Sequence, residues 1–335
     1  MKPLNILMTA GSRRVPLVHA FRNALRTTAA GGRIVVTDVN PLSPAVHVAD
    51  RAYRVPMAND PGYLTELLAI CNAERIRLVV PTIDDELPIV GAAVEQFRAL
   101  GAIVACSTAA TSTLCNDKYA TCRHLRDAGV RAADTWLPAD LPADAKLPLF
   151  IKPRGGRGAV GAFPLRSKRE LDFFVGYVDA PVIQEYLDGP EFTIDVLCDF
   201  DGQPLSIVPR ERVVIRSGVM DRGRTVKNPR LIELARLACV AIPFAGPLNI
   251  QCRMKGGEPV IFEINPRFSG GIPLTIEAGA DFPRMLVRLA VGGRVDPSIG
   301  SFREDLWMTS FESSFFLHAT EIEMPTLERR ITEVA

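Results

Sequence analysis

The sequence predicts an α/β protein in which a domain built on a parallel sheet precedes a second unit that mixes helices with strand hairpins. Two observations carry this prediction. Residues 1–110 alternate short, continuously apolar strands with helical spacing, whereas from Asn116 onward strands are joined by turns that contain glycine. The chain has 335 residues, which is enough for two or three packed units with a sizeable core.

The first 110 residues contain strand signals separated by helix signals. Continuous apolar strands of this kind are typical of a parallel sheet that helices cover on both faces. We expect strands at 6–9, 33–38, 78–81 and 102–106, and helices at 15–27, 63–73 and 87–99. Because ligands of such sheets lie beyond the carboxyl ends of the strands, the loops 10–14, 38–40 and 82–86 are candidate binding loops.

This first domain lacks the fingerprint of a dinucleotide site. Gly11 begins no G-x-G-x-x-G pattern, which such sites use to approach a pyrophosphate. Asp38 follows the second strand and would suit a ribose, but without the glycines a turn residue is the favoured interpretation. A dinucleotide-dependent oxidoreductase is therefore disfavoured.

The second unit is organised around a glycine-rich loop. A helix is expected at 119–128, because Gly129 is a typical helix end, and a Pro/Asp-rich connector follows at 137–148. Further strands are expected at 149–154, 182–187 and 192–197. The tail, 301–335, has strand character at 306–317 and a charged end.

Composition excludes several classes of function. The net charge of +1 argues against a nucleic-acid-binding protein. No apolar run approaches the length of a membrane span, so no membrane partner is expected. The seven cysteines are scattered without a Cys-x-x-Cys pair, and we interpret them as small buried residues in a reduced compartment. We therefore expect a cytoplasmic protein.

The most informative motif is a set of polar residues near position 263. Glu263, Asn265 and Arg267 are spaced at i, i+2 and i+4, so on an extended strand they share one face. The first two offer oxygen ligands of the kind that Mg²⁺ prefers, and Arg267 offers a fork of donors to phosphate oxygens. A hairpin through Gly256 and Gly257 would place Gln251 beside Glu263 as a third oxygen ligand. The competing interpretation is the polar edge of an ordinary sheet.

A second set of residues suggests a nucleotide. The loop 155–161 contains Gly155, Gly156 and Gly158 directly after a strand that bears Lys152, and such a loop can wrap phosphate oxygens. It is not a Walker loop, because the G-K-[ST] ending is missing. Lys118 and Lys152 would each neutralise a phosphate. Taken singly, the loop and the lysines would be surface features.

Two further clusters are candidate substrate contacts. The segment 209–227 places six cations in nineteen residues and is a candidate anion clamp, with Arg210 and Arg224 as its main members. A solvated charged surface is the alternative. Asp84 and Glu86, in a loop at a strand end of the first domain, would suit a substrate amine.

In this order the motifs resemble those of the ATP-grasp superfamily. They are Asp117-Lys118, Ile151-Lys152-Pro153, the glycine loop, Gln184-Glu-Tyr-Leu187, Gly189-Pro-Glu191, Asn249-Ile-Gln251 and Glu263-Ile-Asn-Pro-Arg267. The synthetase units of the carbamoyl-phosphate synthase large subunit look most similar, because they also have Gln in the first metal position. The resemblance covers about residues 1–300. It implies a Rossmann-like pre-ATP-grasp domain at 1–110, a two-lobed α+β ATP-grasp domain at 111–300 with a lid lobe at about 118–183, and a C-terminal extension at 301–335.

The resemblance also implies roles for individual residues. Lys118, Lys152 and the glycine loop would hold ATP phosphates. The backbone of Glu185, Tyr186 and Leu187 would contact adenine, and Glu191 the ribose. Gln251, Glu263 and Asn265 would bind Mg²⁺, with Mn²⁺ as a substitute. Arg267 would stabilise the transferring phosphoryl group.

The function implied is that of an ATP- and Mg²⁺-dependent ligase that forms ADP and an acyl phosphate, which an amine or another nucleophile then attacks. Such chemistry needs no protein nucleophile, and the chain has no Cys–His glutaminase signature. Its partners would be a small carboxylate and a nucleophile, with a homodimer or a partner subunit as further expectations. The alternative is a nucleotide-binding regulatory or partner-dependent protein with weak turnover.

Overall fold

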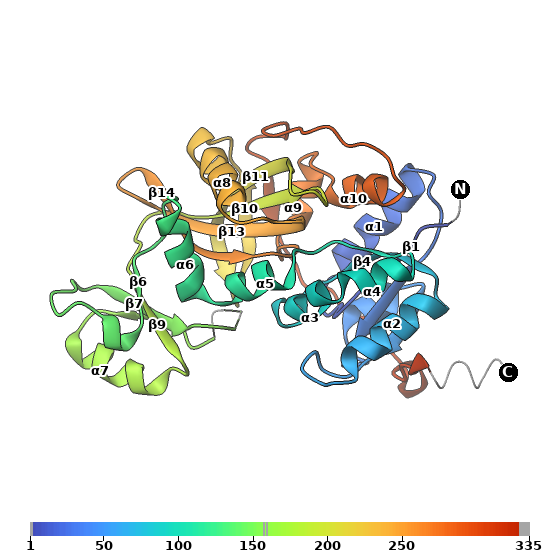
Figure 1. Cartoon of the computed structure of the whole chain (residues 1–335), viewed down its shortest axis with the longest axis horizontal. Helices are drawn as coiled ribbons and strands as arrows, with labels where there is room; N and C mark the ends of the chain where they lie inside the picture. The colour runs from blue at the N-terminus through green and yellow to red at the C-terminus, as the bar shows by residue number, and fades with distance from the viewer. Residues whose placement is uncertain (1–2, 157, 159, 328–335) are drawn as a thin grey trace.

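The computed structural model describes residues 3–156, 158 and 160–327, and within them the chain forms three sheets (Figure 1). A parallel five-stranded sheet comes first in the chain. A small four-stranded antiparallel sheet and a six-stranded antiparallel sheet follow. The predicted fold class, a parallel-sheet domain followed by a two-lobed α+β unit, is therefore confirmed. The exact domain boundaries stay a prediction.

The first sheet has the strand order β3-β2-β1-β4-β5, with every neighbouring pair parallel. Its strands are β1 (Asn5–Met8), β2 (Ile34–Asp38), β3 (Arg51–Arg54), β4 (Ile76–Val80) and β5 (Ile103–Val104). The order reverses between β1 and β4, so the loops after these two strands border the topological switch point, where open α/β sheets bind ligands.

Helices cover both faces of this sheet. They are α1 (Val15–Thr27), α2 (Tyr63–Ala73), α3 (Leu87–Ala92) and α4 (Val94–Ala99), and the short 3₁₀ turns η1 (Pro44–Val48) and η2 (Asp84–Glu86) lie between them. Ile6 packs in the core that contains α1, while its neighbour Leu7 packs in the core that contains α2 and α4, as alternation along a strand requires. The bounds of α1 and α2 match the predicted ones. The single helix predicted at 87–99 is instead two helices, because Ala93 leaves the helical conformation.

The small sheet forms a separate lobe, at the lower left of Figure 1, with the order β6-β9-β7-β8. Its strands are β6 (Thr135–Trp136), β7 (Leu149–Pro153), β8 (Phe163–Leu165) and β9 (Pro181–Glu185), and η3 (Pro138–Asp140) lies between the first two. Helix α7 (Lys168–Tyr177) covers one face and begins with a capping box between Ser167 and Glu170. This lobe has its own hydrophobic core around Ile151 and Ile183.

The six-stranded sheet has the order β14-β13-β10-β11-β12-β15. Its strands are β10 (Glu191–Cys198), β11 (Pro204–Arg216), β12 (Val219–Thr225), β13 (Gly246–Lys255), β14 (Glu258–Asn265) and β15 (Trp307–Thr309). The remaining helices are α5 (Ala109–Asn116), α6 (Lys118–Asp127), α8 (Pro229–Ala241), α9 (Ile272–Glu277) and α10 (Phe282–Ala290). One core holds α8 and the apolar residues around α5 and α6 against β10, β13 and β14.

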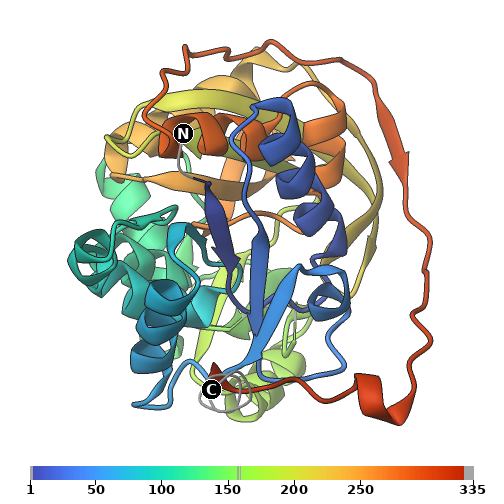
Figure 2. The same ribbon diagram turned by 90° about the vertical axis from the view of Figure 1, so that its right-hand side faces the viewer.

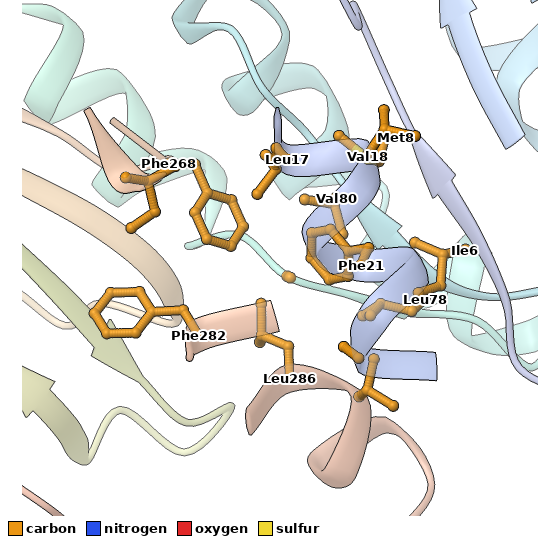
Figure 3. Packing of buried hydrophobic residues seen from close by; sticks show 14 of the residues in the cluster. Ile6, Met8, Leu17, Val18, Phe21, Leu78, Val80, Phe268, Phe282 and Leu286 are labelled. Atoms are coloured by element: carbon orange, nitrogen blue, oxygen red, sulfur yellow. The ribbon is translucent and has the colours of Figure 1, made fainter. Parts of the chain in front are cut away.

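The other large core joins the six-stranded sheet to the first domain. Figure 3 shows Phe21 of α1 beside Phe268, which follows β14, with Leu286 of α10 close by. The rings of Phe21 and Phe268 meet edge to face, with centroids 5.9 Å apart. The first domain and this sheet therefore share one continuous core.

The predicted hairpin of β13 and β14 is confirmed. Gly256 and Gly257 both have positive φ, 60° and 81°, which is the requirement of a two-residue type I′ turn. The resulting register pairs Gln251 with Glu263. Strand β14 ends at Asn265, so Arg267 lies just beyond it.

After α10 the chain forms a strap along the outside of the molecule, visible at the right of Figure 2. Only Trp307–Thr309 of the strand predicted at 306–317 pairs, with β12. The strap then continues through η4 (Ala319–Glu321) to the first domain, where the N–H of Arg54 donates to the carbonyl of Pro325 (3.0 Å) and Leu327 is buried. Residues 328–335 of the predicted extension lie outside the described residues. No helix in the described ranges has the length and apolar character needed to cross a membrane.

Candidate active site

A pocket of about 290 Å³ lies between the small sheet and the six-stranded sheet. Both sheets contribute polar side chains to it, and Phe150 and Phe262 contribute apolar walls. Of the predicted site residues, the lining includes Lys152, Gly158, Glu185, Tyr186, Leu187, Glu191, Gln251 and Glu263. The fold thus brings together residues that are more than a hundred positions apart in the sequence.

The alternation of strand β10 explains how the site is built. Ile194 and Val196 face the core under α8, and Glu191, Thr193 and Asp195 have the opposite parity and so lie on the opposite face of the sheet. Asp195 and Glu191 each pair with an arginine of the adjacent strand β11. The face toward the pocket is therefore polar and charged.

The two lysines predicted to hold phosphates are both buried. Lys118, at the start of α6, donates from Nζ to the carbonyls of Gly155 (3.1 Å) and Gly156 (2.8 Å), and so holds the glycine loop. Lys152 donates to the carbonyl of Phe262 (3.2 Å) and lies 4.0 Å from the Glu263 carboxylate. Burial lowers the pKa of Lys152, an effect that the nearby Glu263 partly offsets.

The glycine loop has the backbone freedom that was expected of it. Gly156 and Gly158 have φ values of 80° and 74°, which L side chains rarely adopt. The described part of this loop borders the pocket through Gly158.

The segment predicted for adenine and ribose also lines the pocket. The carboxylate of Glu185 accepts from the N–H of Asp134 (3.0 Å) and pairs with Lys255. Glu191 lies between two arginines and pairs with both Arg212 and Arg253. Neither arginine was singled out from the sequence.

The predicted metal ligands lie together on β13 and β14. Arg212 donates to Oε1 of Gln251 (3.0 Å), and Asn265 donates to Oε1 of Glu263 (3.1 Å). A carboxylate and two amide oxygens form a hard donor set that fits Mg²⁺, an ion that usually takes one or two protein carboxylates and completes its shell with phosphates and water. In the part of the chain that the structure describes, there is no cluster of three or more His, Cys, Asp or Glu that would favour another metal.

Arg267 links the predicted metal ligand Asn265 to the first domain. Its guanidinium donates to Oδ2 of Asp84 from Nε (3.2 Å) and Nη2 (2.8 Å), and to Oδ1 of Asn265 (3.2 Å). Asp84 therefore contacts Arg267, although the sequence suggested a substrate amine as its partner.

Three other residues are placed differently from the prediction. Glu86 is fully buried, and burial raises its pKa. Its carboxylate accepts hydrogen bonds from the Tyr63 hydroxyl and from the N–H groups of Thr82 (2.8 Å) and Ile83 (3.2 Å), so it stabilises its own loop. Arg210 is 1 % exposed and forms a two-pronged pair with Asp195. These contacts hold the side chains of Glu86 and Arg210 in the protein interior.

Arg224 also lies away from the pocket. It is partly exposed and pairs with Glu211 (2.8 Å) and Asp305 (3.0 Å) beside the Trp307 ring. The anion clamp predicted from Arg210 and Arg224 is therefore not assembled. Arg212, two residues after Arg210 on the same strand, is the arginine of this segment that lines the pocket. Its acidic partner Glu191 was visible in the sequence, but the pairing depends on the register of β10 and β11.

Two sequence families match the chain in consecutive segments. Residues 6–105 match the family described as "PylC-like, N-terminal domain", and residues 178–313 match the family described as "ATP-grasp in the biosynthetic pathway with Ter operon".

Curated relatives and solved structures agree with these matches. The chain is 22 % identical to the 3-methyl-D-ornithine–L-lysine ligase of Methanosarcina barkeri over 284 residues, which is 82 % of this chain and 72 % of the relative. It is 22 % identical to the arginine-specific carbamoyl phosphate synthase large chain of Bacillus subtilis over 296 residues, but spans only 28 % of that chain. The L-amino acid ligase of Bacillus licheniformis has the same fold, with a TM-score of 0.68 at 19 % identity, covering 91 % of this chain and 78 % of that one.

The biotin carboxylase of Campylobacter jejuni, solved as a beta-gamma-ATP complex, also shares the fold, with a TM-score of 0.71 at 15 % identity over 90 % of this chain and 74 % of that one. The fold, the pocket and the sequence matches define an ATP-grasp enzyme of the ligase type. More particularly, the chain carries a PylC-like N-terminal domain followed by an ATP-grasp domain, and carbamoyl phosphate synthase large chains are among its relatives. The resemblance predicted from the motifs is thereby confirmed.

Proposed function

We propose that this protein uses ATP to activate a carboxylate as an acyl phosphate, with release of ADP, and that an amine or another nucleophile then displaces phosphate. The observation that carries the proposal is the convergence of Lys152, Arg212 and the Gln251–Glu263 pair on one pocket between two sheets. Cations and hard oxygen ligands together suit a polyphosphate with its metal ion.

Each residue has a defined part in this proposal. Lys152 and Lys118 would neutralise phosphate oxygens, and the burial of Lys152 strengthens that interaction because little water screens it. Glu185 and Leu187 would border the adenine, and Glu191 the ribose. Gln251, Glu263 and Asn265 would hold Mg²⁺, or Mn²⁺ in its place, which offsets charge on the phosphates when bound.

Arg267 would act on the transferring phosphoryl group. Its position is fixed by Asn265 on one side and Asp84 on the other, so it needs little reorganisation during the reaction. In the first step a carboxylate oxygen attacks the γ-phosphorus and the bond to ADP breaks. In the second step the nucleophile forms its bond to the acyl carbon, and phosphate leaves. Positioning and charge stabilisation would supply the catalysis.

The proposal is tested by measuring ADP formation from Mg-ATP against pools of small carboxylates, amino acids and bicarbonate. One pool should stimulate ADP release, and Glu263→Gln should abolish that stimulation. Arg224→Gln is the matched control, because it removes a charge outside the pocket and should behave as the unmodified protein. No stimulation by any pool, with ATP binding confirmed in the same samples, would favour a regulatory ATP-binding protein instead.

A further inference from the structure

Arg212 connects three parts of the pocket. It belongs to β11, lines the pocket and has a side chain that is 5 % exposed. Nη1 donates to Oε1 of Glu191 (2.5 Å) and to Oε1 of Gln251 (3.0 Å), and Nη2 donates to the carbonyl of Gly218 (2.6 Å). One guanidinium therefore contacts the residue predicted for ribose, a predicted metal ligand and the turn between β11 and β12.

The turn that contains Gly218 is packed against the glycine loop. A Cβ atom added at Gly218 would lie 3.0 Å from the carbonyl carbon of Gly158 and 3.1 Å from its Cα, so the two backbones are in contact. Gly218 also has a φ of 74°, which L side chains rarely adopt. The guanidinium of Arg212 is therefore held on one side by Glu191 and on the other by a turn that rests on the loop.

The contacts of Arg212 show what this residue alone supplies. Its Nε is buried and has no acceptor among the described residues, which is a costly arrangement that native proteins use sparingly. Glu191 does not depend on Arg212 for a counter-charge, because it also pairs with Arg253. Gln251 is different. Among the residues that the structure describes, Arg212 is the one hydrogen-bond partner of the Gln251 side chain.

Gln251 needs such a partner because the two ends of an amide differ. The oxygen can bind a cation, whereas the NH₂ group donates hydrogen bonds and cannot. A guanidinium only donates, so its neighbour must be the oxygen of Gln251 and not the NH₂ group. A carbonyl oxygen has two lone pairs, and the second stays available to the metal ion that Glu263, the cross-strand partner of Gln251, would also bind.

We propose that Arg212 is a positioning residue for the metal ion, because it fixes the amide of Gln251 with its oxygen toward the ion. This inference rests on the proposed function and adds a residue to its metal site. Removing a group that orients a metal ligand lowers metal affinity by about 10- to 100-fold. The charge of Arg212 is offset by Glu191, which weakens its repulsion of the ion.

The test measures Mn²⁺ binding, because Mn²⁺ is paramagnetic and can take the place of Mg²⁺. Free Mn²⁺ is followed by electron paramagnetic resonance during titration of the protein saturated with a non-hydrolysable ATP analogue, so no turnover is needed. Arg212→Gln should weaken Mn²⁺ binding by about 10- to 100-fold. Arg253→Gln is the matched control, since Arg253 also pairs with Glu191 but does not bond Gln251, and it should change the affinity by less than about threefold.

A second variant separates orientation from charge and from folding. Gln251→Glu replaces the amide by a carboxylate, which presents an oxygen whichever way it turns. When Arg212→Gln is added to this variant, Mn²⁺ affinity should fall by less than about threefold, because no orientation remains to be fixed. A loss as large as that caused by Arg212→Gln alone would mean that Arg212 acts through its charge or by supporting the fold, and would overturn the proposal.

Binding of the same analogue in the presence of EDTA identifies a direct contact with the phosphates. Without metal, Arg212→Gln should bind the analogue within about threefold of the unmodified protein, and a loss of about tenfold or more would place Arg212 on the phosphates and refute the inference. Equal Mn²⁺ affinity in Arg212→Gln and the unmodified protein would also refute it and leave the ligase proposal standing. An unmodified complex that binds no Mn²⁺ would refute both this inference and the metal assignment of the proposed function.

Discussion

Replacing Arg210 with methionine should destabilise the fold strongly. The side chain is 1 % exposed, and its guanidinium contacts both oxygens of Asp195 as well as Ser269. Without Arg210, the equally buried carboxylate of Asp195 keeps Thr275 as its side-chain donor and loses its counter-charge. Removing one partner of a buried pair costs about 3–5 kcal/mol. The same change at Arg224, a partly exposed residue, should cost less than about 1 kcal/mol.

Urea unfolding measures this difference, followed by circular dichroism and by the fluorescence of Trp136 and Trp307. The midpoint of Arg210→Met should fall by on the order of 1–3 M, whereas that of Arg224→Met should barely move. A double variant, Arg210→Met with Asp195→Leu, should recover most of the loss, because it removes both charges and keeps the volume apolar. If Arg210→Met unfolded within about 1 kcal/mol of the unmodified protein but lost ADP formation, Arg210 would act on a ligand, as the sequence first suggested.

Three further predictions concern the pocket and its supports. Glu263→Gln should lower ADP formation by at least about a hundredfold while leaving the circular dichroism spectrum and urea midpoint unchanged, because it removes the carboxylate among the predicted metal ligands; retained turnover would contradict the metal assignment. Lys152 binds phosphate as a cation, and burial lowers its pKa. ATP affinity should therefore be full at low pH and fall as pH rises through a value below that of an ordinary lysine; a Lys152→Gln variant that showed the same fall in a fluorescence titration would exclude Lys152 as its source. Glu86→Ala should cost on the order of 3 kcal/mol in urea unfolding, because it leaves Tyr63 and two backbone N–H groups without their acceptor, and should leave KM for the acid unchanged; a raised KM in a stable variant would return Glu86 to the substrate site.

Local patterns in the sequence were sufficient for much of the fold. The apolar spacing of residues 15–27 and 63–73 predicted two helices with the bounds that the structure has. The two glycines at 256 and 257 predicted a hairpin, and alternation along its strands then predicted that Gln251 would face Glu263. In each case the determining information lies within one turn or one strand.

The predictions that were wrong have a common cause. The true position of each residue depends on contacts between segments that are distant in the sequence. Arg210 and Arg212 lie two residues apart on one strand and have the same side chain, so the sequence does not distinguish them. The alignment of β11 with β10 decides that Arg210 pairs with Asp195 and Arg212 with Glu191. Glu86 was interpreted as a loop carboxylate because the sequence does not show that the Tyr63 hydroxyl donates a hydrogen bond to it. The predicted strand at 306–317 pairs over three residues only, with residues 222–224 of β12, although β12 itself begins at Val219.

The shared core has a consequence for motion. Because α1 and α10 are packed together and the strap ties both ends of that assembly, the first domain and the six-stranded sheet should move as one rigid body. The small lobe has its own core around Ile151 and is joined to this body through the segments that precede β6 and follow β9. Opening and closing over a nucleotide would then be a hinge rotation of that lobe alone, with the metal ligands fixed on the stationary side. The two connections, one of which borders the pocket through Tyr186 and Leu187, would then be the hinge of that rotation.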